Sequence, residues 1–322
     1  MSTQLPLIVI AVRDRDFKVV DINSGTAQVV YESGPTEDLN RTHLTGSGRP
    51  PFRPFGIEID KDYIYVASND CIGKFDRQTY QYKGLLETMP MYTNTHQILK
   101  ITSPTSRYQW AVCNTAINCI GLFNDSKDYV NIDVTTGQVH ILPVPSPENC
   151  NEQDVCHLNS LAMYDDGRIL FCRNNNKTPK KLSDFCTLDL NTYEIKELFS
   201  AGFFAHNVCK VNSKIYTLST GTGRVLEADM DNNYKITGHN ITPHVDIRFL
   251  RGMDVFNGEL IFSDSIFHKV KEIEENQALN PFNVQALDRH AYICVLNPST
   301  KEKIKLPLPG TDTITDLRLL ID

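Results

Sequence analysis

Three histidines, an asparagine and an arginine stand at or near the start of strand-like segments in this sequence. They are His96, His157, Asn159, His206 and Arg251. Neutral imidazole is a common ligand of zinc, copper and iron, so three such rings with an open coordination position would suit a catalytic metal. The guanidinium of Arg251 instead offers parallel donors that match a carboxylate or a phosphate. The set therefore indicates a divalent transition metal (iron, zinc, manganese or copper) and a small anionic ligand.

The segments that carry these residues repeat one order of elements. Each begins with an inner strand, passes through a polar turn into a strongly apolar strand, and continues into a third strand. This order is typical of a propeller blade. The inner strands are expected at 55–59, 96–101, 159–163, 206–211 and 251–255.

The innermost strands of a propeller line its central channel, so residues at equivalent positions meet at one end of it. Aligning the inner strands on their apolar alternation gives six equivalent residues: Phe55, His96, Asn159, His206, Arg251 and Thr315. His157 lies two residues before Asn159 and faces the same way in a strand of period two. We therefore expect a polar ring at one mouth of the channel. The plain alternative is a wet channel mouth whose polar side chains bond only water and backbone.

The sixth blade is divided between the two ends of the chain. A strand at 314–321 would join strands at 6–12, 18–21 and 28–31, because a closed ring leaves no sheet edge exposed. We predict an all-β, six-bladed β-propeller, a single domain over residues 1–322, whose terminal blade is closed by the N- and C-terminal strands. Two long insertions, 33–54 and 268–290, either cover the ring or are solvated excursions.

Charge and cysteine usage limit the partners and the compartment. The net charge of −7 and the pI near 5.7 leave no basic stripe for phosphates, so neither nucleic acid nor an anionic membrane is expected as a partner. The apolar run at 7–12 is too short for a secretion signal or a membrane span. The nine cysteines include no C-x-x-C pair, which indicates reduced thiols and a cytoplasmic protein.

Sequence words around the ring resemble a bacterial propeller family, domain of unknown function 4915. Residues 156–162, C-H-L-N-S-L-A, resemble that family's C-H-L-N-G-L-A, and F-L-R-G-M-D at 249–254 is similar to its F-x-R-G-L-x-F. The sequence departs from the family at Gln97, where the family has Asp, and at 204–207, where F-A-H-N replaces M-P-H-S. The resemblance implies the propeller fold and the ring positions, and it implies no particular reaction.

Two functions follow from such a ring. In the first, a metal-dependent enzyme, His96, His157 and His206 hold the metal, Asn159 holds a water or substrate oxygen, and Arg251 clamps an anionic group. Hydrolysis, elimination and oxidation all remain open. In the second, the same ring binds a small anionic molecule or a peptide end without turnover. The sequence leaves open whether the protein is an enzyme, and it leaves the oligomeric state unknown.

Overall fold

The computed structural model describes most of the chain outside its longest connecting segments. The described residues are 5–12, 16–23, 25, 27–33, 54–68, 71–86, 95–126, 128–140, 154–175, 178, 180–241, 248–266, 290–311 and 313–321. The insertions expected at 33–54 and 268–290 lie outside these residues except at their ends. No helix within the described ranges is long and apolar enough to cross a membrane.

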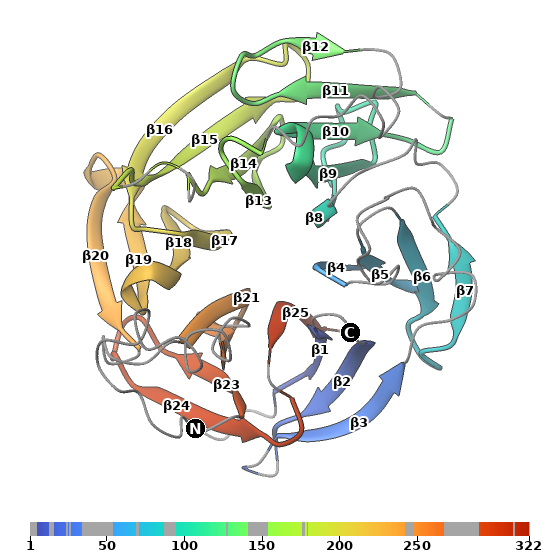
Figure 1. Cartoon of the computed structure of the whole chain (residues 1–322), viewed down its shortest axis with the longest axis vertical. Coiled ribbons are helices and arrows are strands. Elements are labelled where there is room, and N and C mark those ends of the chain that lie inside the picture. The colour runs from blue at the N-terminus through green and yellow to red at the C-terminus, as the bar shows by residue number, and fades with distance from the viewer. Residues whose placement is uncertain are drawn as a thin grey trace, which may run out of the picture.

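Six antiparallel sheets stand around a central axis, so the structure is an all-β, six-bladed β-propeller (Figure 1). Blade 1 contains β25 (Ile314–Leu320), β1 (Leu7–Val12), β2 (Asp16–Asp21) and β3 (Gln28–Ser33). Blade 2 contains β4 (Gly56–Ile59), β5 (Tyr63–Ala67), β6 (Ile72–Asp76) and β7 (Tyr82–Leu85). Blade 3 contains β8 (Thr95–Lys100), β9 (Trp110–Asn114), β10 (Cys119–Phe123), β11 (Tyr129–Asp133) and β12 (Val139–His140).

The remaining blades repeat the pattern. Blade 4 contains β13 (Leu158–Asp165), β14 (Arg168–Arg173), β15 (Ser183–Asp189) and β16 (Ile195–Ala201). Blade 5 contains β17 (Ala205–Val211), β18 (Lys214–Ser219), β19 (Arg224–Asp229) and β20 (Lys235–Asn240). Blade 6 contains β21 (Arg248–Phe256), β22 (Glu259–Ile266), β23 (Ala291–Leu296) and β24 (Lys303–Leu308). Short 3₁₀ turns follow three of the strands: η1 (Thr115–Ile117), η2 (Thr220–Thr222) and η3 (Met230–Asn232).

The predicted closure of the ring by both chain ends is confirmed. β25 lies innermost in blade 1 and pairs with β1, with Leu317 opposite Ile10 and Leu319 opposite Ile8 (Figure 1). The hydroxyl of Thr315 donates to the carbonyl of Ala11 at 3.2 Å and to that of Pro54 at 2.8 Å. The C-terminal strand therefore bonds to the N-terminal strand and to the entry of blade 2.

The apolar core is divided among the contacts between neighbouring blades. The described residues form six buried clusters, and each cluster joins side chains of two adjacent blades. The outermost strands, β7, β16, β20 and β24, were not predicted. Their residues are mostly exposed or half-buried, so these strands lack the apolar alternation by which a strand is recognised in sequence.

Most inner strands carry a β-bulge near their first residues. The pairing with the second strand skips between Thr95 and Ile98, between Leu158 and Ser160, between His206 and Val208, and between Arg251 and Met253. A bulge places two residues opposite one and re-aims their side chains. The same irregularity thus recurs at the positions where the polar ring was predicted. We call this end of the channel, where the inner strands begin, the mouth.

Candidate functional site

The histidines predicted to form the ring share one region of the mouth. The ring centroids of His96 and His157 are 5.0 Å apart, and Phe55 packs on the other side of His96 with a centroid distance of 4.5 Å. His206 lies in the same electrostatic environment, because the charges of Arg251, His157 and His96 all help to lower its pKa. His96 and His206 are buried, while His157 remains partly exposed.

The hydrogen bonds of His96 determine which nitrogen of its neutral ring carries the hydrogen. Its Nδ1 lies 2.5 Å from the hydroxyl oxygen of Thr115, and that hydroxyl donates its own hydrogen to the carbonyl of Leu158. Since the threonine hydrogen is already used, the oxygen accepts from Nδ1–H of His96. In the neutral ring, Nε2 therefore carries the lone pair.

His206 and His157 have the same tautomer by the same logic. Nδ1 of His206 lies 2.7 Å from the carbonyl oxygen of Phe204, and a carbonyl can only accept. Nδ1 of His157 lies 2.8 Å from a carboxylate oxygen of Asp154. In its neutral form, each of the three rings therefore keeps Nδ1 bonded to an oxygen and leaves Nε2 as an acceptor or ligand atom.

His206 is the most constrained of the three. Among the described residues, its Nε2 is buried and has no hydrogen-bond partner. Burial is the main cause that holds the pKa of His206 well below its ordinary value, and the charge of Arg251 is the next. The ring centroids of His206 and Phe249 are 5.2 Å apart, and the guanidinium carbon of Arg251 lies 4.2 Å from the centre of the same Phe249 ring. Phe249 thus contacts both the base and the cation.

Asn159 joins two blades. Its amide nitrogen donates to the carbonyl of Ala205 in blade 5 at 3.2 Å, and its amide oxygen accepts from the hydroxyl of Ser160 at 2.8 Å. These bonds give the side chain a positioning role between blades 4 and 5. Its predicted role in holding a water or substrate oxygen stays a prediction.

The predicted metal ligands have suitable donor atoms, but the described residues do not place three of them around one point. Each of His96, His157 and His206 offers an Nε2 lone pair, as a metal ligand must. Within the ranges that the structure describes, however, no three His, Cys, Asp or Glu side chains are placed to hold one metal ion. The metal site therefore stays a prediction.

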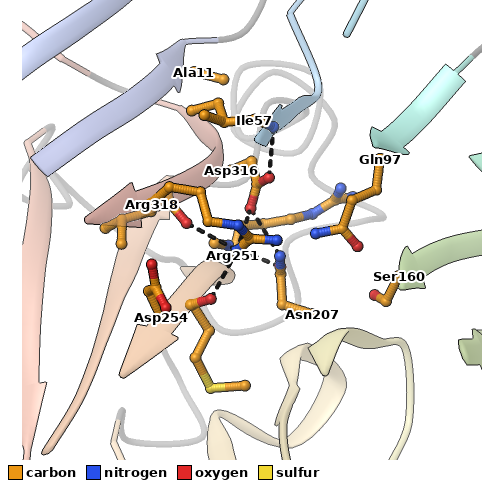
Figure 2. Close-up of polar contacts among 12 residues, drawn as sticks. Ala11, Ile57, Gln97, Ser160, Asn207, Arg251, Asp254, Asp316 and Arg318 are labelled. Atoms are coloured by element: carbon orange, nitrogen blue, oxygen red, sulfur yellow. Dashed lines mark hydrogen bonds and ion pairs between the residues drawn. The ribbon is translucent and has the colours of Figure 1, made fainter. Parts of the chain in front are cut away.

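A second polar layer lies one residue deeper in the channel, and the sequence analysis missed it. Alternate blades each contribute a polar side chain that accepts the backbone N–H of the next inner strand. These bonds run from Leu161 to Gln97 (2.6 Å), from Gly252 to Asn207 (2.8 Å) and from Ile57 to Asp316 (2.9 Å). Figure 2 shows one of these bonds, between Ile57 and Asp316. The amide of Asn207 also donates to Asp316 at 2.9 Å. A polar residue directly after three of the ring residues was the available signal.

A group of buried and half-buried charges lies deeper still, around one arginine. Arg318 donates to the carbonyl of Met253 at 2.8 Å and lies 3.7 Å from a carboxylate oxygen of Asp316 (Figure 2). Burial raises the pKa of Asp316, and Arg318 opposes that shift. Burial likewise raises the pKa of Glu58 to about 7, with Arg318 lowering it and Asp254 adding to the rise. Glu58 is therefore partly protonated near neutral pH.

Stability should depend on pH through Glu58. Its pKa in the folded protein, about 7, exceeds its ordinary value of 4.5, so the folded state holds the proton more tightly. Its contribution is fully present below pH 4.5 and is lost as pH rises through 7, by up to about 3 kcal/mol. We expect Glu58→Gln to gain stability relative to the wild type between pH 5 and pH 8 in urea denaturation. Glu197→Gln, on an exposed face of β16, is the control. A stability difference from wild type that does not change with pH would contradict the assignment.

Four buried cysteines have thiols that stay protonated. Eight cysteines lie in the described ranges, and seven of them are buried. Burial raises the pKa of Cys156 and of Cys186 to about 12, and raises the pKa of Cys113 and Cys172 well above the ordinary value. A thiol that stays protonated is neither a good nucleophile nor a metal ligand. These side chains contribute to the core between blades.

Comparisons with known proteins identify the fold and no family. No family model and no curated protein matches this chain. Among solved structures it is similar to a chain of a nidogen/laminin complex, at 8% identity over 98% of both chains and a TM-score of 0.61. It is also similar to a protein of unknown function from Bacteroides caccae (8% identity, 97% and 98% of the chains, TM-score 0.56). A third match is a dihydro-heme d1 dehydrogenase (11% identity, 99% and 76% of the chains, TM-score 0.50). The chain therefore has a propeller fold that also occurs in a protein–protein complex and in an enzyme.

Proposed function

We propose that the mouth is the active site of an enzyme that acts on a small anionic molecule. Arg251 holds the anionic group of the substrate. Nε2 of His206 accepts a proton from another atom of the substrate. The observation that carries this proposal is the buried lone pair of His206, which has no donor among the described residues and lies in the field of a guanidinium.

A buried acceptor without a partner requires an explanation. Leaving such a group unpaired costs about 1–3 kcal/mol, and nearly all buried polar atoms in proteins are paired. A substrate hydrogen aimed at Nε2 of His206 would supply the missing donor. Titratable groups with strongly shifted pKa values cluster at functional sites, which favours this reading over an accident of packing.

Substrate binding would activate the base. In the free protein, the positive charge of Arg251 lowers the pKa of His206 and weakens it as a proton acceptor. An anionic group bound to Arg251 offsets that charge, so the pKa of His206 rises when the substrate is in place. The proton then moves from the substrate to Nε2. The negative charge left on the substrate is stabilised by the guanidinium, and the imidazolium keeps the proton until it is returned or released.

A metal-dependent reaction is the second candidate, and the shared tautomer of the three histidines favours it. Metal-binding histidines commonly donate their other ring N–H to an oxygen, as His96, His157 and His206 do here. A bound transition metal would supply a Lewis acid or an activated water. Elemental analysis of protein purified without chelators distinguishes this candidate. Metal retained by the wild type and lost in His96→Ala would favour it.

Anion binding tests the role of Arg251. We expect Arg251→Ala to weaken binding of acetate and sulfate roughly 10- to 100-fold, because charge-assisted bonds of this kind contribute about 1.5–3 kcal/mol. Calorimetry in buffers of different ionisation enthalpy should show proton uptake on binding near pH 6 in the wild type. His206→Gln should abolish that uptake. Arg168→Ala, which removes an arginine bound to Asp165 at the far end of β14, is the control. Unchanged anion affinity in Arg251→Ala would refute the proposal.

A further inference from the structure

Four exposed apolar side chains lie on segments that precede or connect the strands of blades 4 and 5 at the mouth. Val155, Leu182, Phe203 and Phe204 are 57%, 38%, 36% and 45% exposed. Single exposed apolar residues are ordinary on protein surfaces, whereas a contiguous group is not. We call these four residues the apolar rim.

Backbone hydrogen bonds hold the segments of the apolar rim together. The N–H of Asn175 donates to the carbonyl of Cys156 at 2.8 Å, and its side-chain amide donates to the carbonyl of Leu182, also at 2.8 Å. The next residue, Ser183, donates its N–H to the carbonyl of Gly202 at 3.1 Å. The segments that carry Val155, Leu182 and the two phenylalanines are thus neighbours in the fold.

The turn that carries the two phenylalanines is firmly held. The N–H of Phe203 donates to the hydroxyl of Ser219 at 3.1 Å, and its carbonyl accepts from Gly221 at 2.9 Å. A side chain at position 221 would meet the Phe204 ring at 2.8 Å, so glycine is required beneath it. Phe204 has a φ of 51°, a left-handed conformation that bulky residues rarely adopt. The fold keeps both phenyl rings at the surface instead of burying them.

Two hydrogen bonds connect the apolar rim with the segments that carry His206 and Arg251. The carbonyl of Phe204 accepts from Nδ1 of His206 at 2.7 Å. The hydroxyl of Thr220, beside Gly221 in η2, donates to the carbonyl of Leu250 at 2.8 Å, one residue before Arg251. Apolar surface and the guanidinium therefore flank the same imidazole.

We infer that the substrate carries an aromatic or branched apolar group next to its anionic group. This inference rests on the proposed function, since it extends the ligand of Arg251 onto the apolar rim. The guanidinium and the neutral imidazole select the anionic, hydrogen-bonding part, and the rim selects the apolar part. Removing about 60–100 Å² of a phenyl group from water would tighten binding roughly 10- to 50-fold over the bare anion.

A pair of carboxylates tests the inference in the full chain. We expect phenylacetate to bind the wild type at least roughly 10-fold more tightly than acetate, measured by calorimetry or by NMR titration. Phe203→Ala and Phe204→Ala should each weaken phenylacetate binding several-fold and leave acetate binding within about twofold. Phe203→Gln replaces the phenyl ring with a polar side chain and should behave like the alanine variant. Val30→Ala removes an exposed apolar side chain from β3 and is the matched control.

Each failure has its own signature. If acetate binds through Arg251 but phenylacetate binds no more tightly, the inference is wrong and the proposed function stands. If neither carboxylate binds, the proposed function is wrong as well. If the wild type self-associates in sedimentation analysis and Phe203→Gln makes it monomeric without changing phenylacetate binding, the apolar rim is a contact between copies of the chain, and the inference is overturned.

Discussion

Removing residues 314–322 should leave a chain that cannot reach a stable fold. β25 supplies three almost fully buried side chains, Ile314, Leu317 and Leu319, to the cluster between blades 1 and 6. Losing each of them costs about 2–5 kcal/mol, and the total is comparable with the whole stability of about 5–15 kcal/mol of an ordinary protein. The truncation also exposes the edge of β1 and removes Asp316 from the channel. We expect aggregation and no cooperative thermal transition by circular dichroism.

A shorter truncation is the control, because it removes the chain end and keeps β25. Ending the chain after Leu320 removes an exposed isoleucine and leaves all of β25 in place, so its thermal transition should match that of the wild type. A synthetic peptide of residues 313–322 should restore solubility to the longer truncation when the two are refolded together. A soluble truncated protein with a native-like transition would show that β25 is dispensable.

The second large effect is expected for Gly252→Ala. Gly252 occupies the bulge of β21 with a φ of +57°, where an L-residue is strained. An added Cβ would lie 2.3 Å from the backbone nitrogen of Leu317 and 2.5 Å from its Cβ, so blade 6 would have to move away from blade 1. The bond from Gly252 N–H to Asn207 would be lost with that movement. We expect a loss of about 3 kcal/mol or more in urea denaturation.

Gly167→Ala is the matched control for this substitution. A Cβ at position 167 meets no other atom within 4 Å, and the residue lies outside the left-handed region. Its stability should stay within about 0.5 kcal/mol of the wild type. If Gly252→Ala were equally harmless, the close contact between blades 6 and 1 would be wrong.

The inner strands were predictable because buried strands require apolar side chains, and this requirement appears in the sequence as short apolar segments that end at polar turns. Segments such as 206–211 and 251–255 combine β-branched or apolar residues with a polar turn, and β17 and β21 are found there. The outermost strands of blades 2, 4, 5 and 6 were not predictable on the same grounds. β20, for example, is mostly exposed, so its register is set by pairing with β19 and not by an apolar face.

The polar ring was only partly predictable. The alternation of inner strands indicated that His96 and His206 belong to one end of the channel, and the charges acting on His206 agree with that grouping. The second layer was missed because a side chain's role there depends on which backbone N–H faces it. Asp316 bonds to Ile57, a partner 259 residues away in the sequence. No local pattern encodes such a contact.

The sequence by itself determined the class of fold and the split blade, because strand periodicity and turn chemistry are local properties. Only the tertiary structure decided which ring nitrogen of each neutral histidine carries the hydrogen, since Thr115, Asp154 and the carbonyl of Phe204 bond to Nδ1 in the folded chain. It also decided that Nε2 of His206 is buried beside Arg251 and next to the apolar rim. Burial and charge at a site are sums over neighbours from several blades, and those neighbours meet only when the ring closes.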